Sequence, residues 1–238
     1  MLKIAAHVHT LGTSGCAEVS PADVVRLYKK AEYDGIVVTN HYMKGVFEGY
    51  YAPMPHERQI EFYIAAYRET KRFADEAGML AFLGMELNLE RYNVPGSTYP
   101  VYEFLCYGVT ESFLRQNHRL FDLSQEQAFN LLSSNGIAMC QAHPFRTRTR
   151  FADPFLMHGA EVFNGNPRHN SRDRVAQAAA KAYDFIEVAG DDFHRPEDCG
   201  RAALYVPDGT DTDEKLANAL LARETRVSFR NFGAKKWA

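Results

Sequence analysis

Short apolar segments alternate with amphipathic segments along the chain. Residues 2–6 and 35–39 are apolar runs of strand length. Between them, Ser20 and Pro21 supply an N-cap and a first helical position, and apolar residues then recur at helical spacing. The same patterns predict further strands at residues 79–83, 102–107, 137–140, 161–163, 185–189 and 202–206. They predict further helices at about residues 57–77, 124–135, 171–183 and 212–224.

Strands and helices that alternate in this way favour parallel β-α units. The seven or so central strands predict an α/β fold, a distorted seven-stranded (β/α) barrel of the TIM-like type. An open doubly wound sheet gives a similar pattern and stays the alternative. The 238 residues suit one large domain, so we expect a single catalytic domain over residues 1–238. Residues 92–100 and 146–153 are the clearest irregular loops.

The composition excludes several classes of protein. An apolar content of 46% and a charged content of 24% are those of an ordinary globular chain. The net charge of −3 gives no electrostatic case for a nucleic-acid or membrane partner. The four cysteines form no C-x-x-C pair, which speaks against a zinc ribbon and favours a reducing compartment. Because no apolar run approaches the roughly 20 residues of a membrane helix, and the first residues leave no room for a signal peptide, we expect a cytoplasmic protein.

Metal-binding side chains follow the predicted strands. In a parallel barrel the ends of all strands converge on one face, where active sites are built. A His-x-His pair such as His7 and His9 on an extended strand directs both imidazoles to the same side. Imidazole together with carboxylate suits Zn, Mn or Fe better than Ca or Mg. The sequence therefore predicts a metal site at the strand C-termini, with the candidate ligands His7, His9, His41, Glu86, His143, Asp192 and His194.

Five short motifs between residue 7 and about residue 200 resemble, in order, those of the polymerase-and-histidinol-phosphatase (PHP) family. They are His-Val-His-Thr (7–10), Thr-Asn-His (39–41), Gly-Met-Glu (84–86), Ala-His-Pro (142–144) and Asp-Phe-His (192–194). The resemblance implies a distorted seven-stranded barrel with two or three divalent metal ions, and metal-dependent phosphoester hydrolysis. Carried over by position, it gives one ion to His7, His9, Glu86 and Asp192. It gives a second ion to His41 and His194, and a third to His143, with Glu86 as the bridge.

The chain departs from the family pattern at two ligand positions. Many members have Ser-Asp-Gly where this chain has Thr-Ser-Gly, so the aspartate that binds the second ion is replaced by Ser14. Glu18 or Cys16 is the candidate substitute. The third ion usually has a further histidine between the third and fourth motifs. His118 is the only histidine there but follows a helix-like stretch, so Glu103 on the fourth strand is the better candidate.

Clustered cations predict a hydrolytic mechanism. Two ions polarise a phosphoryl oxygen and lower the pKa of a bridging water. The leaving oxygen needs a proton, and the candidate catalytic residues are His143, Asp192 and His194. Arginine suits the remaining phosphate oxygens because its planar fork donates two parallel hydrogen bonds. The candidate substrate-binding residues are Arg146, Arg195, Asn164 and His169, although a solvated loop explains the arginines, and a turn before Gly165 explains the asparagine, equally well.

These features predict a metal-dependent phosphoesterase that hydrolyses a small phosphorylated metabolite. The chain has no dinucleotide fingerprint, no Walker motif and no Gly-x-Ser-x-Gly, so those enzyme classes lack support. Two alternatives stay open. One is an amidohydrolase-like enzyme that cleaves a C–N bond with the same metals. The other is a metal-binding module without catalysis.

Overall fold

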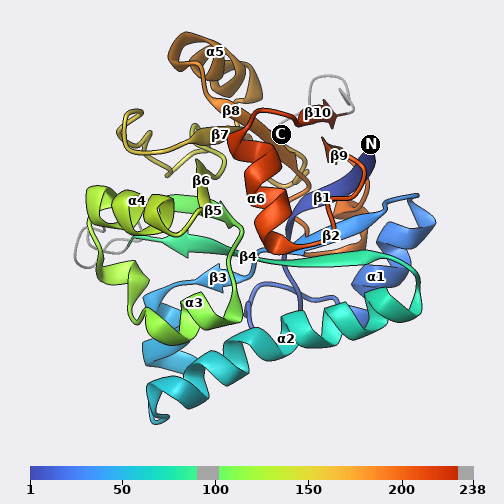
Figure 1. Cartoon of the computed structure of the whole chain (residues 1–238), viewed down its shortest axis with the longest axis vertical. Helices are drawn as coiled ribbons and strands as arrows, with labels where there is room; N and C mark the ends of the chain where they lie inside the picture. Colours follow the sequence, from blue (N-terminus) through green and yellow to red (C-terminus); the bar gives the residue numbers. More distant parts are fainter. Residues whose placement is uncertain (90–101, 230–238) are drawn as a thin grey trace.

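The strands form one mixed sheet in the computed structural model, which describes residues 1–89 and 102–229 (Figure 1). The loop expected at residues 92–100 lies outside the described residues. Nine strands follow the order β10-β9-β1-β2-β4-β5-β6-β7-β8, and β3 pairs with β4. The strands are β1 (Leu2–Val8), β2 (Gly35–Val38), β3 (His41–Tyr42), β4 (Leu80–Asn88), β5 (Glu103–Tyr107), β6 (Ala138–Gln141), β7 (Gly159–Asn164), β8 (Ile186–Gly190), β9 (Ala202–Val206) and β10 (Arg226–Phe229).

The sheet curls into a nearly closed barrel because the chain beyond β8 returns to β1. Val8 and Phe193 form a parallel bridge. Around it, the amide of His9 donates to the carbonyl of Phe193 at 3.0 Å, and the amide of Phe193 donates to the carbonyl of His7 at 3.2 Å. The predicted α/β barrel is therefore confirmed, with nine strands along the sheet instead of seven.

Two strands, β5 and β9, run against the all-parallel arrangement that the sequence predicts. β5 is antiparallel to both of its neighbours, β4 and β6. β9 is antiparallel to β1, and β10 is antiparallel to β9. The expectation of uniformly parallel strands is wrong here because apolar periodicity is the same in both strand directions. One consequence matters for the site: the first residue of β5, Glu103, lies at the end of the barrel where the parallel strands finish.

The helices begin where the sequence predicts. Ser20 caps α1 by accepting from the amide of Asp23, with proline at the first position. Ser124 and Gln127 form the predicted capping box at the start of α4. No helix in the described ranges is long and apolar enough to cross a bilayer. The α-helices are α1 (Pro21–Lys30), α2 (His56–Glu76), α3 (Glu111–Gln116), α4 (Gln125–Ser134), α5 (Asp173–Tyr183) and α6 (Asp213–Leu221). The other helical segments are the π-helix η1 (Gly45–Tyr50) and the 3₁₀ helices η3 (Leu120–Asp122) and η4 (Pro196–Asp198).

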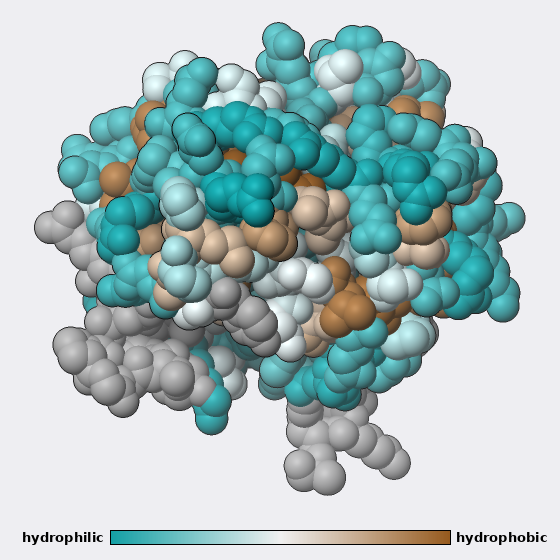
Figure 2. All heavy atoms as spheres, turned by 90° about the horizontal axis from the view of Figure 1, so that it is seen from below, coloured by the Kyte–Doolittle hydropathy of each residue, from teal (hydrophilic) through white to brown (hydrophobic). Residues whose placement is uncertain are grey.

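Helix α6 closes one end of the barrel. Its Leu216 and Leu220 are fully buried in the apolar cluster that fills the barrel, which includes Ile4 and Phe82. Close packing there leaves no room for a polar site. Outside the barrel, α1 lies against α2, and α2 packs on β4 (Figure 1). The face along α2 is mainly hydrophilic, with small separate apolar patches (Figure 2). The open end of the barrel, opposite α6, is thus the place for chemistry.

Candidate metal centre

The seven predicted metal ligands converge on the open end of the barrel. His7 lies within β1, and Glu86 lies within β4. Both residues, together with His9, are fully buried. His9 follows β1, His41 is the first residue of β3, His143 follows β6, and Asp192 and His194 follow β8. Seven residues from distant segments thus meet in one cluster: His7, His9, His41, Glu86, His143, Asp192 and His194.

Glu86 is the centre of this cluster. Its Oε2 lies 2.9 Å from Nδ1 of His41, 3.2 Å from Nε2 of His9 and 3.5 Å from Nε2 of His7. Its Oε1 lies 3.0 Å from Nε2 of His143. Burial alone would raise the pKa of Glu86, but His41 and His7 outweigh that effect and hold the pKa well below its usual range. The side chain is therefore a buried carboxylate whose two oxygens face four imidazoles.

Asp192 forms the other side of the cluster. Its Oδ1 lies 3.5 Å from Nε2 of His7 and 3.4 Å from Nδ1 of His194. Its Oδ2 accepts hydrogen bonds from Nη2 of Arg146 at 2.7 Å and from Nδ2 of Asn164 at 3.2 Å. Burial opposes ionisation, but Arg146 and His7 lower the pKa of Asp192 well below its usual range. Asp192 is thus ionised and oriented from two sides.

Two of the proposed ligands have an unusual backbone. His143 has φ of 28° and Asp192 has φ of 49°. Side chains other than glycine rarely adopt positive φ, and each such residue costs about 1–3 kcal/mol. These two residues follow β6 and β8, so the local turn directs both side chains into the barrel mouth. Strain of this kind concentrates at functional sites.

Glu161 in β7 orients the first histidine. Its Oε1 lies 2.9 Å from Nδ1 of His7, and its Oε2 accepts from the amide of His143 and from Nδ2 of Asn164, both at 2.9 Å. A proton on Nδ1 therefore points at Glu161 and leaves Nε2 of His7 bare toward the cluster. Gly190 makes room for this arrangement, because a Cβ there would lie 2.3 Å from the Cβ of His7.

The donor set fits a divalent metal. The bare Nε2 of His7 lies only 3.1 Å from Nε2 of His9. Within the described part of the chain, Oε2 of Glu86 and Nδ1 of His41 are buried and have no aligned hydrogen-bond partner. Buried lone pairs that face each other in this way call for a cation. Three groups have ligand atoms within 4.8 Å of one another, and their imidazoles and carboxylates suit Zn, Mn or Fe: His7, His9 and Glu86; His9, His41 and His194; His41, Glu86 and Glu103.

Glu103 joins the site and Glu18 does not. Oε2 of Glu103 lies 3.7 Å from Nε2 of His143, and burial together with Glu86 raises the pKa of this carboxyl. The antiparallel direction of β5 brings it there. Glu18 is exposed and forms an ion pair with Arg195 at 2.7 Å. Its carboxylate is thus paired with Arg195 and is not among the three groups found in the described residues.

Ser14 and Cys16 occupy the loop where the family pattern has its aspartate. Oγ of Ser14 lies 3.4 Å from Nδ1 of His9 and accepts from the amide of His41 at 3.1 Å, so it orients the ligands without binding a metal. Cys16 is exposed and lines the same pocket as His41 and His194. Desolvation raises the pKa of this thiol, but the two imidazoles lower it to about 6.

A pocket of about 350 Å³ lies directly above the cluster. Of the predicted substrate-binding residues, Arg146, Arg195 and His169 line it. Asn164 is fully buried and holds carboxylates instead. Burial, aided by Arg146, lowers the pKa of His169 to about 4, so its imidazole is neutral. The residues that line the pocket are Cys16, His41, Glu86, Glu103, His143, Arg146, Asn166, Arg168, His169, Asp192, His194 and Arg195.

The sequence did not mark Arg168 or Glu161 as part of the site. Arg168 forms two hydrogen bonds with the buried carboxylate of Asp198, at 2.6 and 2.7 Å, and its side chain reaches the pocket. It follows an Asn-Pro turn, and nothing local distinguishes it from a surface arginine. Glu161 reveals its role only through contact with His7, which is 154 positions away in the chain. Neither residue carries a short-range signal.

Known proteins match this chain by structure. No family model and no curated protein matches the sequence. A two-domain protein from Bacteroides vulgatus that contains a predicted PHP-like metal-dependent phosphoesterase matches with a TM-score of 0.62 and 19% identity, over 97% of this chain and 65% of that one. An amidohydrolase from Chromobacterium violaceum matches with a TM-score of 0.56 and 16% identity, over 86% and 92% of the two chains. PfuEndoQ, a lesion-specific endonuclease from Pyrococcus furiosus, matches with a TM-score of 0.57 and 13% identity, over 95% and 57%.

These likenesses concern the fold, because the identities are 19%, 16% and 13%. The chain spans 65% of the length of the Bacteroides protein. The match with the Bacteroides protein nevertheless covers 97% of this chain, so the fold implied by the five motifs is confirmed. Proteins with such different names show that the fold leaves the reaction open.

Proposed function

We propose that the protein is a metal-dependent phosphoesterase that hydrolyses a small phosphorylated compound. One observation carries the proposal: five imidazoles and three carboxylates meet at the floor of a pocket whose wall holds three arginines, Arg146, Arg168 and Arg195. The acidic floor suits divalent cations, and the arginines suit an anion bound above them. A phosphoryl group is an anion that both halves of such a pocket can bind together.

The cluster divides into three candidate metal positions. When bound, divalent ions supply a polarised phosphoryl oxygen and a water of lowered pKa. We assign His7, His9, Glu86 and Asp192 to the first ion. We assign His41 and His194 to the second. Glu86, His143 and Glu103 are assigned to the third, which follows from the contacts of both oxygens of Glu86.

Arg146 is the strongest candidate for contact with substrate. Its Nη2 donates to Asp192, whereas its Nε is buried and has no hydrogen-bond partner in the described ranges. A guanidinium has five N–H groups, so Arg146 can hold Asp192 and a phosphoryl oxygen at once. His169 and Arg195 line the same pocket and are proposed as further contacts.

Proton transfer to the leaving oxygen falls to one of three candidates, His143, Asp192 and His194. The side chains of His143 and Asp192 are only 2% exposed, whereas that of His194 is 14% exposed. A group that meets a leaving oxygen has to reach the pocket surface. We therefore propose that His194 lies nearest to the leaving group, where it holds the second ion beside the leaving oxygen, and that His143 and Asp192 lie farther below as ligands.

The size and charge of the pocket favour a small phosphorylated substrate. A volume of about 350 Å³ is at the lower end of the range for small-molecule sites. An amidohydrolase, as the Chromobacterium neighbour is named, can use the same metals, but a scissile amide is neutral and gives the three arginines no negative charge to pair with. A nucleic-acid substrate, as for PfuEndoQ, calls for a cationic surface, whereas this chain has a net charge of −3.

A substrate panel tests the proposal. The full chain, loaded with Zn²⁺, Mn²⁺ or Fe²⁺, is given a small phosphomonoester, a small phosphodiester, an N-acyl amino acid and a single-stranded oligonucleotide. We expect turnover of a small phosphoester, loss of it with a chelator, and loss of it in His9→Ala and Asp192→Ala. His118→Ala, a histidine outside the site, serves as the control, and circular dichroism checks folding. Full turnover in both ligand variants, or turnover of the amide alone, overturns the proposal.

A further inference from the structure

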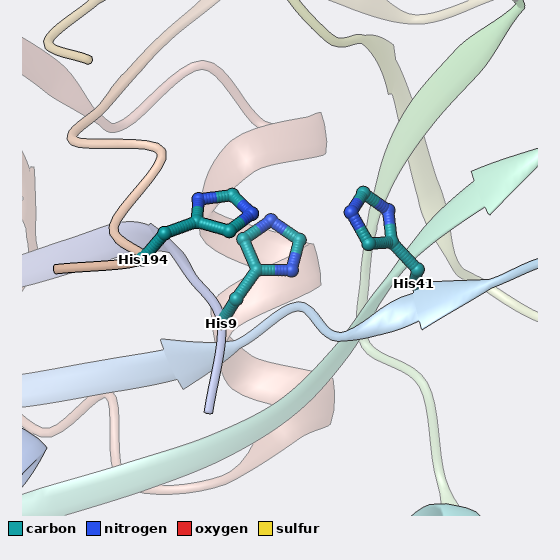
Figure 3. Close-up of side chains that lie close together, drawn as sticks. All are labelled: His9, His41 and His194. Carbon is teal, nitrogen blue, oxygen red and sulfur yellow. The ribbon is translucent and has the colours of Figure 1, made fainter. Parts of the chain in front are cut away.

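Three imidazoles form the outer part of the metal centre. The ring centroid of His9 lies 4.4 Å from that of His41 and 4.3 Å from that of His194. One nitrogen from each of the three rings lies within 4.8 Å of the other two (Figure 3). Nδ1 of His194 donates to the backbone carbonyl of Asp192 at 2.9 Å, which leaves its Nε2 for the cluster. Three neutral imidazoles bring no negative charge to a cation.

The thiol of Cys16 lies against the same imidazoles. Cys16, His41 and His194 line the same pocket, and both imidazoles act on the thiol. Backbone contacts on both sides fix its position: the amide of Ala17 donates to the carbonyl of Ser14 at 3.1 Å, and the amide of Glu18 donates to the carbonyl of His194 at 3.0 Å. The sulfur is therefore held at the cluster by the loop that carries it.

Cys16 differs from the other three cysteines. Cys106 and Cys140 are completely buried in the barrel wall, and Cys199 is half-buried. None of these three is among the residues that line the pocket. Cys16 is the one exposed thiol of the four, and it lines the pocket together with His41 and His194. The position of an exposed thiol beside candidate metal ligands needs a chemical explanation.

Glu86 gives an independent sign that a cation belongs here. Its side chain is 1% exposed, and its Oε2 has no aligned donor among the described residues. The same oxygen lies 2.9 Å from Nδ1 of His41 and 3.2 Å from Nε2 of His9. A buried carboxylate oxygen without a donor costs free energy unless a cation balances it. The buried oxygen of Glu86 therefore indicates a cation next to His41 and His9.

We propose that Cys16 is a metal ligand, and that its thiolate shares the second ion with His41 and His194. The inference rests on the metal centre of the proposed function. A thiolate supplies the negative charge that the imidazoles lack, where related chains use a carboxylate. Sulfur is a soft ligand, so this position selects zinc or ferrous iron over manganese or magnesium. Manganese or magnesium is then restricted to the carboxylate-rich positions around Glu86 and Glu103.

Cobalt spectroscopy tests the sulfur ligand without relying on activity. The full-length protein is titrated with Co²⁺, and the thiolate-to-cobalt charge-transfer band in the near ultraviolet is recorded. We expect the band in the natural sequence and in Cys199→Ser, the matched control. We expect Cys16→Ser and Cys16→Asp to lack it, while Cys16→Asp still binds cobalt. Loss of a side chain that merely supports a ligand lowers metal affinity about 10- to 100-fold. We expect the zinc affinity of Cys16→Ser to fall by at least that factor, and its manganese affinity to change less.

The outcomes separate the two proposals. Cobalt that binds without the band, or a band that survives in Cys16→Ser, overturns the sulfur ligand and leaves the hydrolase intact. A protein that binds no cobalt, zinc or manganese overturns the metal centre and the sulfur ligand together. Cys16→Asp keeps the test decisive, because cobalt bound without the band demonstrates a folded site from which only the sulfur is missing.

Discussion

Replacement of Glu161 by glutamine tests whether a residue behind the metal centre determines how the centre binds. Glu161→Gln keeps the size of the side chain but exchanges one oxygen for an NH₂ group. Oε2 faces two donors, the amide of His143 and Nδ2 of Asn164, each at 2.9 Å. Oε1 faces only Nδ1 of His7, at 2.9 Å. The amide oxygen therefore takes the side with two donors, and the NH₂ group points at His7.

This orientation reverses the tautomer of His7. An NH₂ group that donates to Nδ1 drives the imidazole proton to Nε2, the atom that faces Glu86 and His9. A protonated Nε2 cannot bind a metal. Metal binding therefore has to move the proton back to Nδ1 and break the new hydrogen bond from the NH₂ group. Loss of a supporting partner of this kind lowers metal affinity about 10- to 100-fold, which equals about 1.4–2.8 kcal/mol.

Metal affinity and the tautomer are measured together. Competition with a chelator gives the affinity, and the ¹⁵N chemical shifts of the imidazole give the tautomer. Glu187→Gln is the matched control, because Glu187 is exposed on the neighbouring strand β8. We expect the affinity to fall in Glu161→Gln and to stay unchanged in Glu187→Gln. An unchanged affinity with a reversed tautomer would refute the link between the two, and an unchanged tautomer would refute the hydrogen-bond argument itself.

Two further predictions concern stability. Tyr28→Phe removes a 2.8 Å hydrogen bond to buried Asp191, whose pKa burial raises to about 6. At pH 8 that carboxyl is ionised, so we expect urea unfolding to show that the free energy of unfolding falls by about 1.5–3 kcal/mol. The control is Tyr33→Phe, whose hydroxyl donates to a neutral carbonyl, and there we expect a fall of about 1 kcal/mol. Equal losses in the two variants contradict the argument. Gly190→Ala places a Cβ 2.3 Å from that of a proposed ligand, and we expect weaker metal binding and about 1–3 kcal/mol of destabilisation, whereas Gly49→Ala, with open space around it, changes neither.

The structure brings the seven predicted ligands together because their positions depend on local periodicity. His7 lies in β1 and His9 directly follows the end of that strand, so the two-residue spacing of an extended chain turns both side chains the same way. His143 and Asp192 follow apolar runs, and the ends of parallel strands meet at one face. The position of Glu103 depends instead on strand direction, which apolar periodicity does not encode. It was a weaker candidate for that reason, although the structure brings it to the cluster.

The supporting residues could not be predicted because they act across the closed barrel. Glu161 reaches His7 only because β7 and β1 lie on either side of β8 and its extension. The positive φ of Asp192 has no sequence signal, since glycine is absent there. Ser14 likewise looks like a lost ligand in the sequence, whereas the structure makes it the partner of His9.

Protons and metal ions compete for the same nitrogens in this centre. Glu86 and Asp192 have pKa values held well below their usual range, so both are ionised in a buried site where Arg146 balances only one of them. Burial lowers the pKa of His7 and His41, but the surrounding carboxylates outweigh burial and raise both values. A raised pKa means that these imidazoles keep a proton to a higher pH in the absence of metal. Those protons supply the positive charge that a divalent ion supplies when bound, so metal binding has to release them and becomes tighter as pH rises.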